Sequence, residues 1–273
     1  MSKFQAPMRR KNTARGHYYV DANGIRIPGV TTILGDGLPK KALINWAASA
    51  TAEYAIDNWD ELGDLSASAR LKKLNGGRYG VTDKAKKRGT EVHGYAERLV
   101  KGEKVTGVPE LLRGHVEAYA RFLDRFDVQP VVVEESIVNY TIGYAGTLDL
   151  IADILNPETG QHERWLLDAK TNEKGIYGET ALQLAAYRNA EFLVDAEGNE
   201  TPMLDVVRCG AIHITSSDAQ LIPVLAERQQ FLAFRYAQQI AEFDAGSRDL
   251  VGAPLDPPHE STIASIEWKE AKA

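Results

Sequence analysis

The sequence predicts a single α/β domain in which helices flank a central mixed β-sheet. Apolar residues recur at helical spacing through much of the first half of the chain. Short β-branched and apolar runs, separated by turn residues, dominate the stretch between about residues 130 and 170. A further helix, further strands and a closing helix follow. This order of elements is typical of helices packed on a sheet, because each amphipathic element must bury its apolar face.

The N-terminal part predicts a basic leader, a hairpin and a helical region. Residues 1–15 are polar and basic, so we expect a flexible leader. Two β-prone runs flank the Asn23-Gly24 turn and predict a hairpin over residues 17–27. Between helices, residues 59–80 form a charged connector whose helical middle is expected to end at Gly76-Gly77. The helical region is expected over about residues 40–127, with helices at 41–58, 82–100 and 108–126.

The C-terminal part predicts the sheet, whose core is expected over about residues 130–225. The domain as a whole is expected over residues 16–245, followed by a C-terminal tail at 246–273 that is rich in proline and then charged. We expect strands at residues 131–138, 145–154, 164–170 and 219–224, a hairpin between 194 and 214, and helices at 177–193 and 225–243.

Composition excludes several classes of protein. The chain has 273 residues, 44% hydrophobic and 26% charged, which is ordinary for a globular protein. No apolar run reaches the roughly 18–20 residues that a membrane helix needs, so no membrane partner is expected. The basic N-terminus lacks the apolar run of a secretory signal. The single cysteine, Cys209, excludes an intramolecular disulfide and a four-cysteine zinc or iron–sulfur site, and we expect a cytoplasmic protein in which Cys209 is a small buried residue.

The charge is unevenly distributed along the chain. The net charge is −6, yet residues 1–130 hold 22 Lys+Arg against 15 Asp+Glu, a net of +7. Residues 131–273 hold the other 10 Lys+Arg against 23 Asp+Glu, a net of −13. Basic clusters at residues 9–11, 40–41, 72–73 and 84–88 would neutralise phosphates if they lay along one groove. The same clusters also fit solvated helix faces and a basic leader, and charge alone leaves these two interpretations even.

Three charged residues form the candidate reaction centre. Asp149 interrupts an apolar strand. Asp168 and Lys170 lie two residues apart on the next strand, so their side chains share a face of the sheet, where Asp149 can meet them. Two carboxylates with a lysine at a strand edge suit a hard divalent cation such as Mg²⁺ or Mn²⁺. The alternative is an exposed Asp–Lys pair beside an unrelated aspartate, because a D-x-K triplet on its own is common.

The order of these motifs resembles the PD-(D/E)xK nuclease superfamily, and within it the RecB-like exonuclease branch. An apolar strand bears Asp149, a short turn follows, and an apolar strand ends in Asp168-Ala169-Lys170 before a helix. Gly89-Thr90-Glu91-Val92-His93 resembles the helix that supplies a histidine in that branch, and Gln183 with Tyr187 matches its Q-x-x-x-Y motif. Residues 30–34 and 41–46 are similar to the opening of phage-encoded members. The resemblance spans roughly residues 17–240.

The resemblance implies a restriction-endonuclease-like core and a role for each matching residue. His93, Asp149, Asp168 and the Ala169 carbonyl would hold Mg²⁺ or Mn²⁺, and Lys170 would orient or deprotonate the attacking water or offset phosphate charge. Glu134 would be the acidic residue of the preceding strand, although the adjacent Glu135 leaves the register open. The first residue of the D-x-K triplet is Asp168, which the family permits. Four cluster cysteines are absent, so no iron–sulfur cluster is expected. Gln183, Tyr187, Lys86, Lys87 and Arg88 would contact DNA or support the site.

These residues also have ordinary structural interpretations. His93 would fit a partly buried, hydrogen-bonded histidine, and Gln183 with Tyr187 would fit packing of a helix on the sheet. Asp153 shares a strand face with Asp149, so it fits either a second-metal residue or a strand-end charge facing water. The remaining candidates, His115 and His213, are expected to be structural.

The implied function is a metal-dependent DNA nuclease. The branch predicts an exonuclease acting on duplex ends or single strands in recombination, repair or end-processing, in the cytoplasm of a prokaryote or a phage-infected cell. Related exonucleases also suggest a homo-oligomer and a recombination partner protein. Two alternatives stay open: an endonuclease of the same fold, and a non-catalytic DNA-binding protein that retains the fold.

Overall fold

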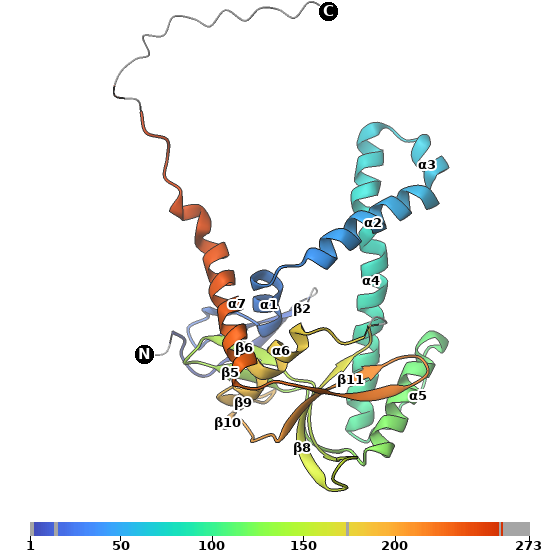
Figure 1. Ribbon diagram of the computed structural model, residues 1–273, viewed down its shortest axis with the longest axis vertical. Helices are drawn as coiled ribbons and strands as arrows, with labels where there is room; N and C mark the ends of the chain where they lie inside the picture. Colours follow the sequence, from blue (N-terminus) through green and yellow to red (C-terminus); the bar gives the residue numbers. More distant parts are fainter. Residues whose placement is uncertain (1–2, 14–15, 173–174, 257, 259–273) are drawn as a thin grey trace, which may run out of the picture.

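The structure is a computed structural model that describes residues 3–13, 16–172, 175–256 and 258, without the side chains of residues 42 and 78–86. It confirms the α/β class, with a mixed five-stranded sheet flanked by helices (Figure 1). That sheet has the order β12-β11-β8-β7-β4. β11 runs parallel to β8, and the other neighbours are antiparallel. Its strands are β4 (Gln129–Val133), β7 (Leu150–Leu155), β8 (His162–Lys170), β11 (Arg208–Ile214) and β12 (Ala219–Val224).

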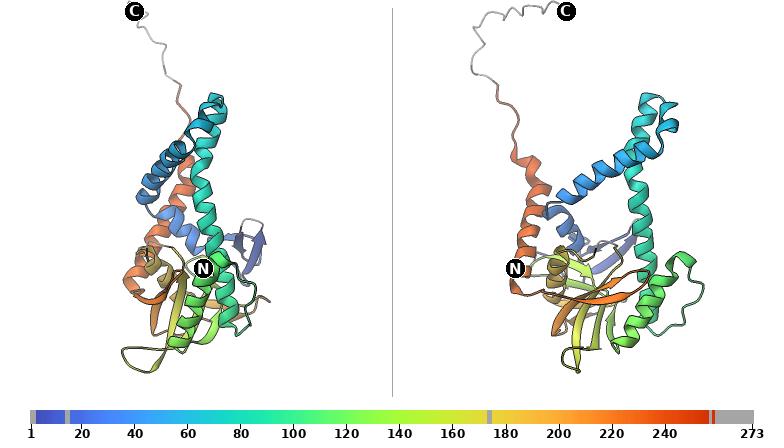
Figure 2. Two further views of the ribbon diagram at one scale, coloured as in Figure 1. Left: turned by 90° about the vertical axis from the view of Figure 1, so that its right-hand side faces the viewer. Right: turned by 45° about the vertical axis from the view of Figure 1, so that its right-hand side comes forward.

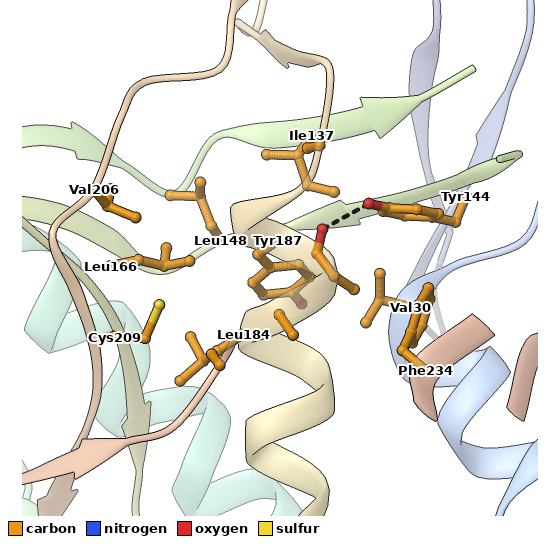
Figure 3. Close-up of a cluster of buried hydrophobic side chains, with 14 of the residues drawn as sticks. Val30, Ile137, Tyr144, Leu148, Leu166, Leu184, Tyr187, Val206, Cys209 and Phe234 are labelled. Atoms are coloured by element: carbon orange, nitrogen blue, oxygen red, sulfur yellow. Dashed lines mark hydrogen bonds between the residues drawn. The ribbon is translucent and has the colours of Figure 1, made fainter. Parts of the chain in front are cut away.

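Helices cover both faces of this sheet because its strands are apolar on both sides. Leu167 and Ala169 of β8 point into a core shared with α4 (Ala67–Val100) and α5 (Glu110–Arg125). Leu166 points the other way, into a core shared with α1 (Val30–Gly37), α6 (Glu179–Arg188) and α7 (Arg228–Gly246). Figure 3 shows this second core, in which the Tyr144 hydroxyl donates to the Ala186 carbonyl at 2.8 Å. Cys209 is buried in the same core, as expected.

A second sheet adjoins the first, with the order β10-β9-β5-β6. Its strands are β5 (Ser136–Asn139), β6 (Tyr144–Thr147), β9 (Phe192–Val194) and β10 (Glu200–Pro202). The expected uninterrupted strands at 131–138 and 145–154 are therefore wrong, because each is divided between the two sheets. The chain crosses at Glu134-Glu135 and returns at Leu148-Asp149. The two crossings are bonded to each other, since the Glu134 N–H donates to the Asp149 carbonyl at 3.0 Å and the Leu148 N–H to the Glu135 carbonyl at 2.9 Å.

The expected flexible leader is also wrong over its described part. Residues Arg9–Thr13 form β1, which pairs with β2 (Gly16–Val20) and extends the predicted hairpin with β3 (Arg26–Ile27) to three strands. Phe4 and Met8 are buried in a third cluster that includes residues of β2 and β5. Two apolar residues in a basic segment are enough to bind it to the domain, because each buries its full side chain.

The helical region differs from expectation at Gly76-Gly77. These glycines do not end a helix, because α4 runs without a break from Ala67 to Val100. A Cβ at Gly77 would lie 2.4 Å from Cγ of Tyr54, so this glycine permits close contact between α4 and α2 (Lys41–Asp57). Together with α3 (Trp59–Gly63), α2 and the N-terminal part of α4 form an arm that extends away from the sheets (Figures 1 and 2).

The last third of the chain departs from expectation in its pairing. The turn at residues 195–199 joins β9 to β10, whereas β11 pairs with β8 and β12 and belongs to the larger sheet. The helix expected at 177–193 ends at Arg188 because β9 begins at Phe192. A short 3-10 helix, η1 (Ser247–Leu250), follows α7. Within the described residues, no helix has the length and apolar character required to cross a bilayer.

Candidate metal centre

Three residues from distant parts of the chain converge beside the end of β8. His93 lies on α4, Glu134 at the first crossing between the sheets and Asp149 at the second. Each offers one ligand atom, and these atoms all lie within 4.8 Å of one another. His93 Nδ1 is 3.6 Å from Asp149 Oδ2. One imidazole nitrogen and two carboxylate oxygens at this spacing form a candidate site for a divalent cation.

The backbone at Glu134 explains which of the two adjacent glutamates joins the cluster. Glu134 has a φ of 53°, which is the left-handed region and costs a non-glycine residue free energy. This turn out of β4 brings the Glu134 side chain to His93 and Asp149. Glu135 is absent from that group of three, and its pKa is raised by burial and by the charge of Asp195. The structure therefore brings Glu134, rather than Glu135, to this cluster, and its functional role remains a prediction.

A cavity of about 20 Å³ lies among the three ligands. A space of that size holds about one water-sized particle. His93, Glu134 and Asp149 line it together with Glu97 and Tyr119, and buried apolar residues such as Leu150 and Ile212 also line it. The donor chemistry and the size of the space fit a single cation bound directly by protein atoms.

Asp168 and Lys170 lie next to this cluster in a buried hydrogen-bond network. Asp168 is 2% exposed, and its Oδ2 lies 2.6 Å from Lys170 Nζ. Gln183 Nε2 donates to Asp168 Oδ1 at 2.8 Å, and Lys170 Nζ donates to Gln183 Oε1 at 3.3 Å. Gln183 Nε2 also reaches the hydroxyl of Tyr187 at 3.2 Å. The expected support of the lysine by Gln183 and Tyr187 is thus present as geometry, with Tyr187 also packed in the core.

The backbone of Ala169 connects the two groups. Its N–H donates to Asp149 Oδ2 at 2.8 Å and so orients that carboxylate. The family resemblance implies that the Ala169 carbonyl is a metal ligand, and that remains a prediction. Asp168 is likewise outside the group of three whose ligand atoms converge, so its role as a ligand also remains a prediction.

The electrostatics of the centre favour binding of positive charge. Burial, followed by the charges of Asp149 and Glu97, raises the pKa of Glu134 to about 8. Burial and the charge of Asp149 raise the pKa of Asp168 to about 6, opposed by the Lys170 ammonium. Burial lowers the pKa of Lys170, but its ion pair with Asp168 outweighs this and leaves the pKa above the usual value. Lys170 is therefore an ammonium at neutral pH, and a cation in the cluster would relieve the crowding of carboxylates.

Two larger clefts adjoin the small cavity and share residues with it. One, of about 420 Å³, shares His93 and Ala169 and also contains Lys170 and Gln183. The other, of about 810 Å³, shares Glu97, Val133 and Glu134, and one of its walls is β1 with Arg9, Arg10 and Lys11. The centre is therefore accessible from two directions.

Residues near the second cleft were not expected from the sequence. The Tyr19 hydroxyl lies 2.7 Å from Thr147 Oγ1, and Arg10 Nη1 donates to that oxygen at 3.4 Å. His17 Nε2 lies 2.9 Å from the same hydroxyl. The position of Thr147, two residues before Asp149, was the only signal in the sequence, because β1 and β2 approach the centre through tertiary contacts alone.

Several other candidates lie outside the centre. Asp153 is outside the group of three whose ligand atoms converge, and it accepts two hydrogen bonds from Arg164, each at 2.9 Å, near the end of β7. His213 Nε2 lies 2.8 Å from the Asn172 carbonyl oxygen, and His115 is buried, both in keeping with structural roles.

The basic run expected to contact DNA lies on α4, the helix that carries His93. Lys87 is exposed and lies 3.9 Å from Glu91, and Arg88 is half-buried. The side chain of Lys86 falls outside the described residues. DNA contact by this run remains a prediction.

Comparison of the sequence with known proteins identifies no relative. No protein-family model matches the chain, and a search of curated proteins gives no significant match. Interpretation of the centre therefore depends on its residues, their spacing and their chemistry.

Proposed function

We propose that this protein is a metal-dependent DNA nuclease that hydrolyses phosphodiester bonds. The observation that carries the proposal is the convergence of His93, Glu134 and Asp149 beside the buried Asp168–Lys170 pair. Carboxylates of this kind are a cation site, and an adjacent ammonium is a partner for phosphate. An exonuclease that acts in recombination, repair or end-processing is the first form of the activity to test.

The residues of the chain divide the chemistry between them. A divalent cation, when bound, supplies Lewis-acid polarisation of the phosphate and makes water more acidic. Lys170 donates a hydrogen bond and positive charge to the phosphate or to the attacking water, because its raised pKa keeps it protonated. Gln183 holds both Lys170 and Asp168, and so fixes the direction of the ammonium. Water adds to phosphorus, its proton leaves to solvent or to a carboxylate of the centre, and the bond to the departing oxygen breaks.

The ligand set also bears on the metal. Carboxylates suit both Mg²⁺ and Mn²⁺, whereas an imidazole nitrogen is a softer ligand than Mg²⁺ prefers. His93 therefore favours Mn²⁺, and we expect Mn²⁺ to support cleavage at lower concentration than Mg²⁺.

Cleavage assays with linear duplex and single-stranded DNA test the proposal. We expect Mg²⁺- or Mn²⁺-dependent degradation by the wild type and its loss in Asp149→Ala, Asp168→Ala and Lys170→Ala. Asp153→Ala is a matched control, because Asp153 is an aspartate of the same sheet that bonds Arg164 away from the centre. Undiminished cleavage by all three variants would reject the assignment.

One observation favours an endonuclease as the second candidate. Clefts adjoin the centre on two sides, so a strand that continues in both directions would fit. Covalently closed circular DNA separates the two forms, because an exonuclease needs an end. A non-catalytic DNA-binding protein is disfavoured by the complete set of charged residues, and it would retain DNA without metal-dependent cleavage.

A further inference from the structure

The cleft of about 420 Å³ beside Lys170 has one large exposed aromatic side chain. Tyr177 is 54% exposed and lines this cleft together with Lys170 and Gln183. Among the residues whose side chains the structure describes, no other tyrosine, phenylalanine or tryptophan lines it. The volume lies at the lower end of the range of about 300–1,000 Å³ typical of small-molecule sites, so it suits one nucleotide unit rather than a base pair.

The backbone around Tyr177 is held at both ends. On one side, the Thr180 N–H donates to the Tyr177 carbonyl at 3.0 Å, where α6 begins. On the other, the Asn172 side chain donates to the Gly175 carbonyl, and the Asn172 carbonyl lies 2.8 Å from Nε2 of His213 on β11. Within the described part of the chain, no aromatic ring stacks on Tyr177. The ring is therefore exposed, and the described residues Gly175 and Tyr177 are each held by a hydrogen bond.

The charges in the cleft complement the phosphate of a nucleotide. Among the described residues that line it, Lys170 carries an ammonium, which also pairs with the buried Asp168 at 2.6 Å. Glu179, a described acid of the lining, is paired with Lys40 at 2.6 Å, so its charge is largely compensated. The cleft thus offers an ammonium for a phosphate oxygen and, a short distance away, an aromatic face next to the apolar Ile176. Protein sites for single strands combine these two elements, cation and stacking surface.

We propose that Tyr177 is a stacking surface for the base adjacent to the cleaved phosphate, and that this base must be unpaired to reach it. The inference rests on the proposed nuclease function and identifies its substrate as a single-stranded or locally unpaired segment. Inside a duplex both faces of a base are covered by its neighbours, so a nucleotide must leave the stack before one face can meet Tyr177.

Binding of single-stranded oligonucleotides containing 2-aminopurine tests this directly. The fluorescence of 2-aminopurine falls when the base stacks, so each position is labelled in turn and titrated with protein in EDTA, where no cleavage is expected. We expect quenching at one or two adjacent positions by the wild type and by Tyr177→Phe. Tyr177→Ala should abolish the quenching and weaken binding about 5- to 150-fold, the range that loss of one stacked base represents. Tyr236→Ala is the matched control, since Tyr236 is 64% exposed on α7 and does not line the cleft.

A double-mutant cycle, in which Tyr177 is changed in the protein and one base is removed from the DNA, separates stacking from a general effect on binding. An abasic nucleotide at the quenched position should weaken binding to the wild type but leave binding to Tyr177→Ala unchanged. Equal losses in both proteins, or unchanged affinity in Tyr177→Ala, would overturn the assignment of Tyr177. If the wild type cleaves DNA, and Tyr177→Ala matches it in quenching and affinity, only this inference fails. If the wild type neither binds nor cleaves any DNA, the proposed nuclease function fails as well.

Discussion

The candidate centre has an open half and a buried half that are built in different ways. In the open half, the side chains of His93 and Asp149 are 31% and 21% exposed, and their ligand atoms face a small cavity together with that of Glu134. In the buried half, Asp168 is 2% exposed and is held with Lys170 in a network of hydrogen bonds to Gln183. The open half brings three potential metal-binding side chains to a small cavity, whereas in the buried half Asp168 is ion-paired with Lys170 and accepts a hydrogen bond from Gln183.

This difference indicates that the two halves have different roles. Carboxylates and an imidazole that converge on one small cavity are suited to receive a cation, because a bound cation offsets the repulsion between the carboxylates. A buried ion pair is suited to hold an ammonium in one place, because breaking it would leave an unpaired charge in the interior. Substitutions should therefore act on metal affinity in the open half and on both stability and chemistry in the buried half.

The largest effect is expected for Lys170→Met. Cleavage should fall by at least about 100-fold, the scale for loss of one charged donor to a transition state. The free energy of unfolding should fall by about 3 kcal/mol at pH 8, because Asp168 is left buried without its partner. The loss should shrink toward pH 5, where Asp168 is protonated. The double variant Asp168→Asn with Lys170→Met should recover stability in urea unfolding without recovering cleavage, and a Lys170→Met protein as stable as the wild type at pH 8 would contradict the buried pair.

His93→Ala should act on metal binding with little effect on folding. We expect Mn²⁺ affinity, measured by calorimetry, to fall about 10- to 100-fold. The free energy of unfolding without metal should change by less than about 1 kcal/mol, since the side chain is partly exposed. His162→Ala is the control, because His162 is similarly exposed at 36% and pairs with Asp127 elsewhere. Equal Mn²⁺ affinities for the His93→Ala and wild-type proteins would remove His93 from the ligand set.

Two glycines, one near each half of the centre, test how tightly each half is packed. A Cβ at Gly146 would lie 2.6 Å from Cε1 of Tyr187. Gly146→Ala should therefore lower the free energy of unfolding by about 1–3 kcal/mol. It should also reduce cleavage, because it displaces Tyr187, which is hydrogen-bonded to Gln183. Gly94, next to His93 on α4, has no atom within 4 Å of such a Cβ. Gly94→Ala should therefore stabilise the protein by about 0.5–1 kcal/mol through helix propensity. Thermal unfolding of both variants, side by side, would test the contrast, which fails if the two shifts have the same sign.

The smallest effect is the change in stability of the metal-free protein between pH 7 and pH 8. Glu134 has a folded pKa of about 8, above its value in the unfolded chain, so the unfolded state loses this proton first as pH rises. Stability should be fully present below about pH 4.5 and should fall as pH rises toward 8, by at most about 1.4 kcal/mol per pH unit for one proton. Urea unfolding in EDTA at pH 7 and pH 8 measures the slope. Glu134→Gln should flatten it, and an unchanged slope would exclude Glu134 as its source.

Patterns within single elements predicted much of the fold and the centre. The α/β class and most helices follow from apolar periodicity, and the proximity of Asp168 and Lys170 follows from strand geometry. What the patterns missed depends on contacts between distant segments. Gly77 looks like a helix terminator, but Tyr54 packs against it and α4 continues.

The missed features of the centre have the same origin. Glu134 and Glu135 are chemically alike and adjacent, so only the left-handed backbone at the crossing between sheets distinguishes them. Arg10 lies in a segment that resembles a solvated leader, and it reaches Thr147 because Phe4 and Met8 anchor that segment. Such anchoring by two isolated apolar residues produces no periodicity.

The origin of the three ligands in one helix and two inter-sheet crossings has a thermodynamic consequence. Residues 93, 134 and 149 are close together only when α4 has docked and both sheets have formed. An unfolded chain would present no such site, so a cation bound there acts as a reversible cross-link on the folded state. Its contribution would grow with the logarithm of its concentration, to about 2.7 kcal/mol at 100 times the dissociation constant. The melting temperature of the protein would then report the free concentration of the metal.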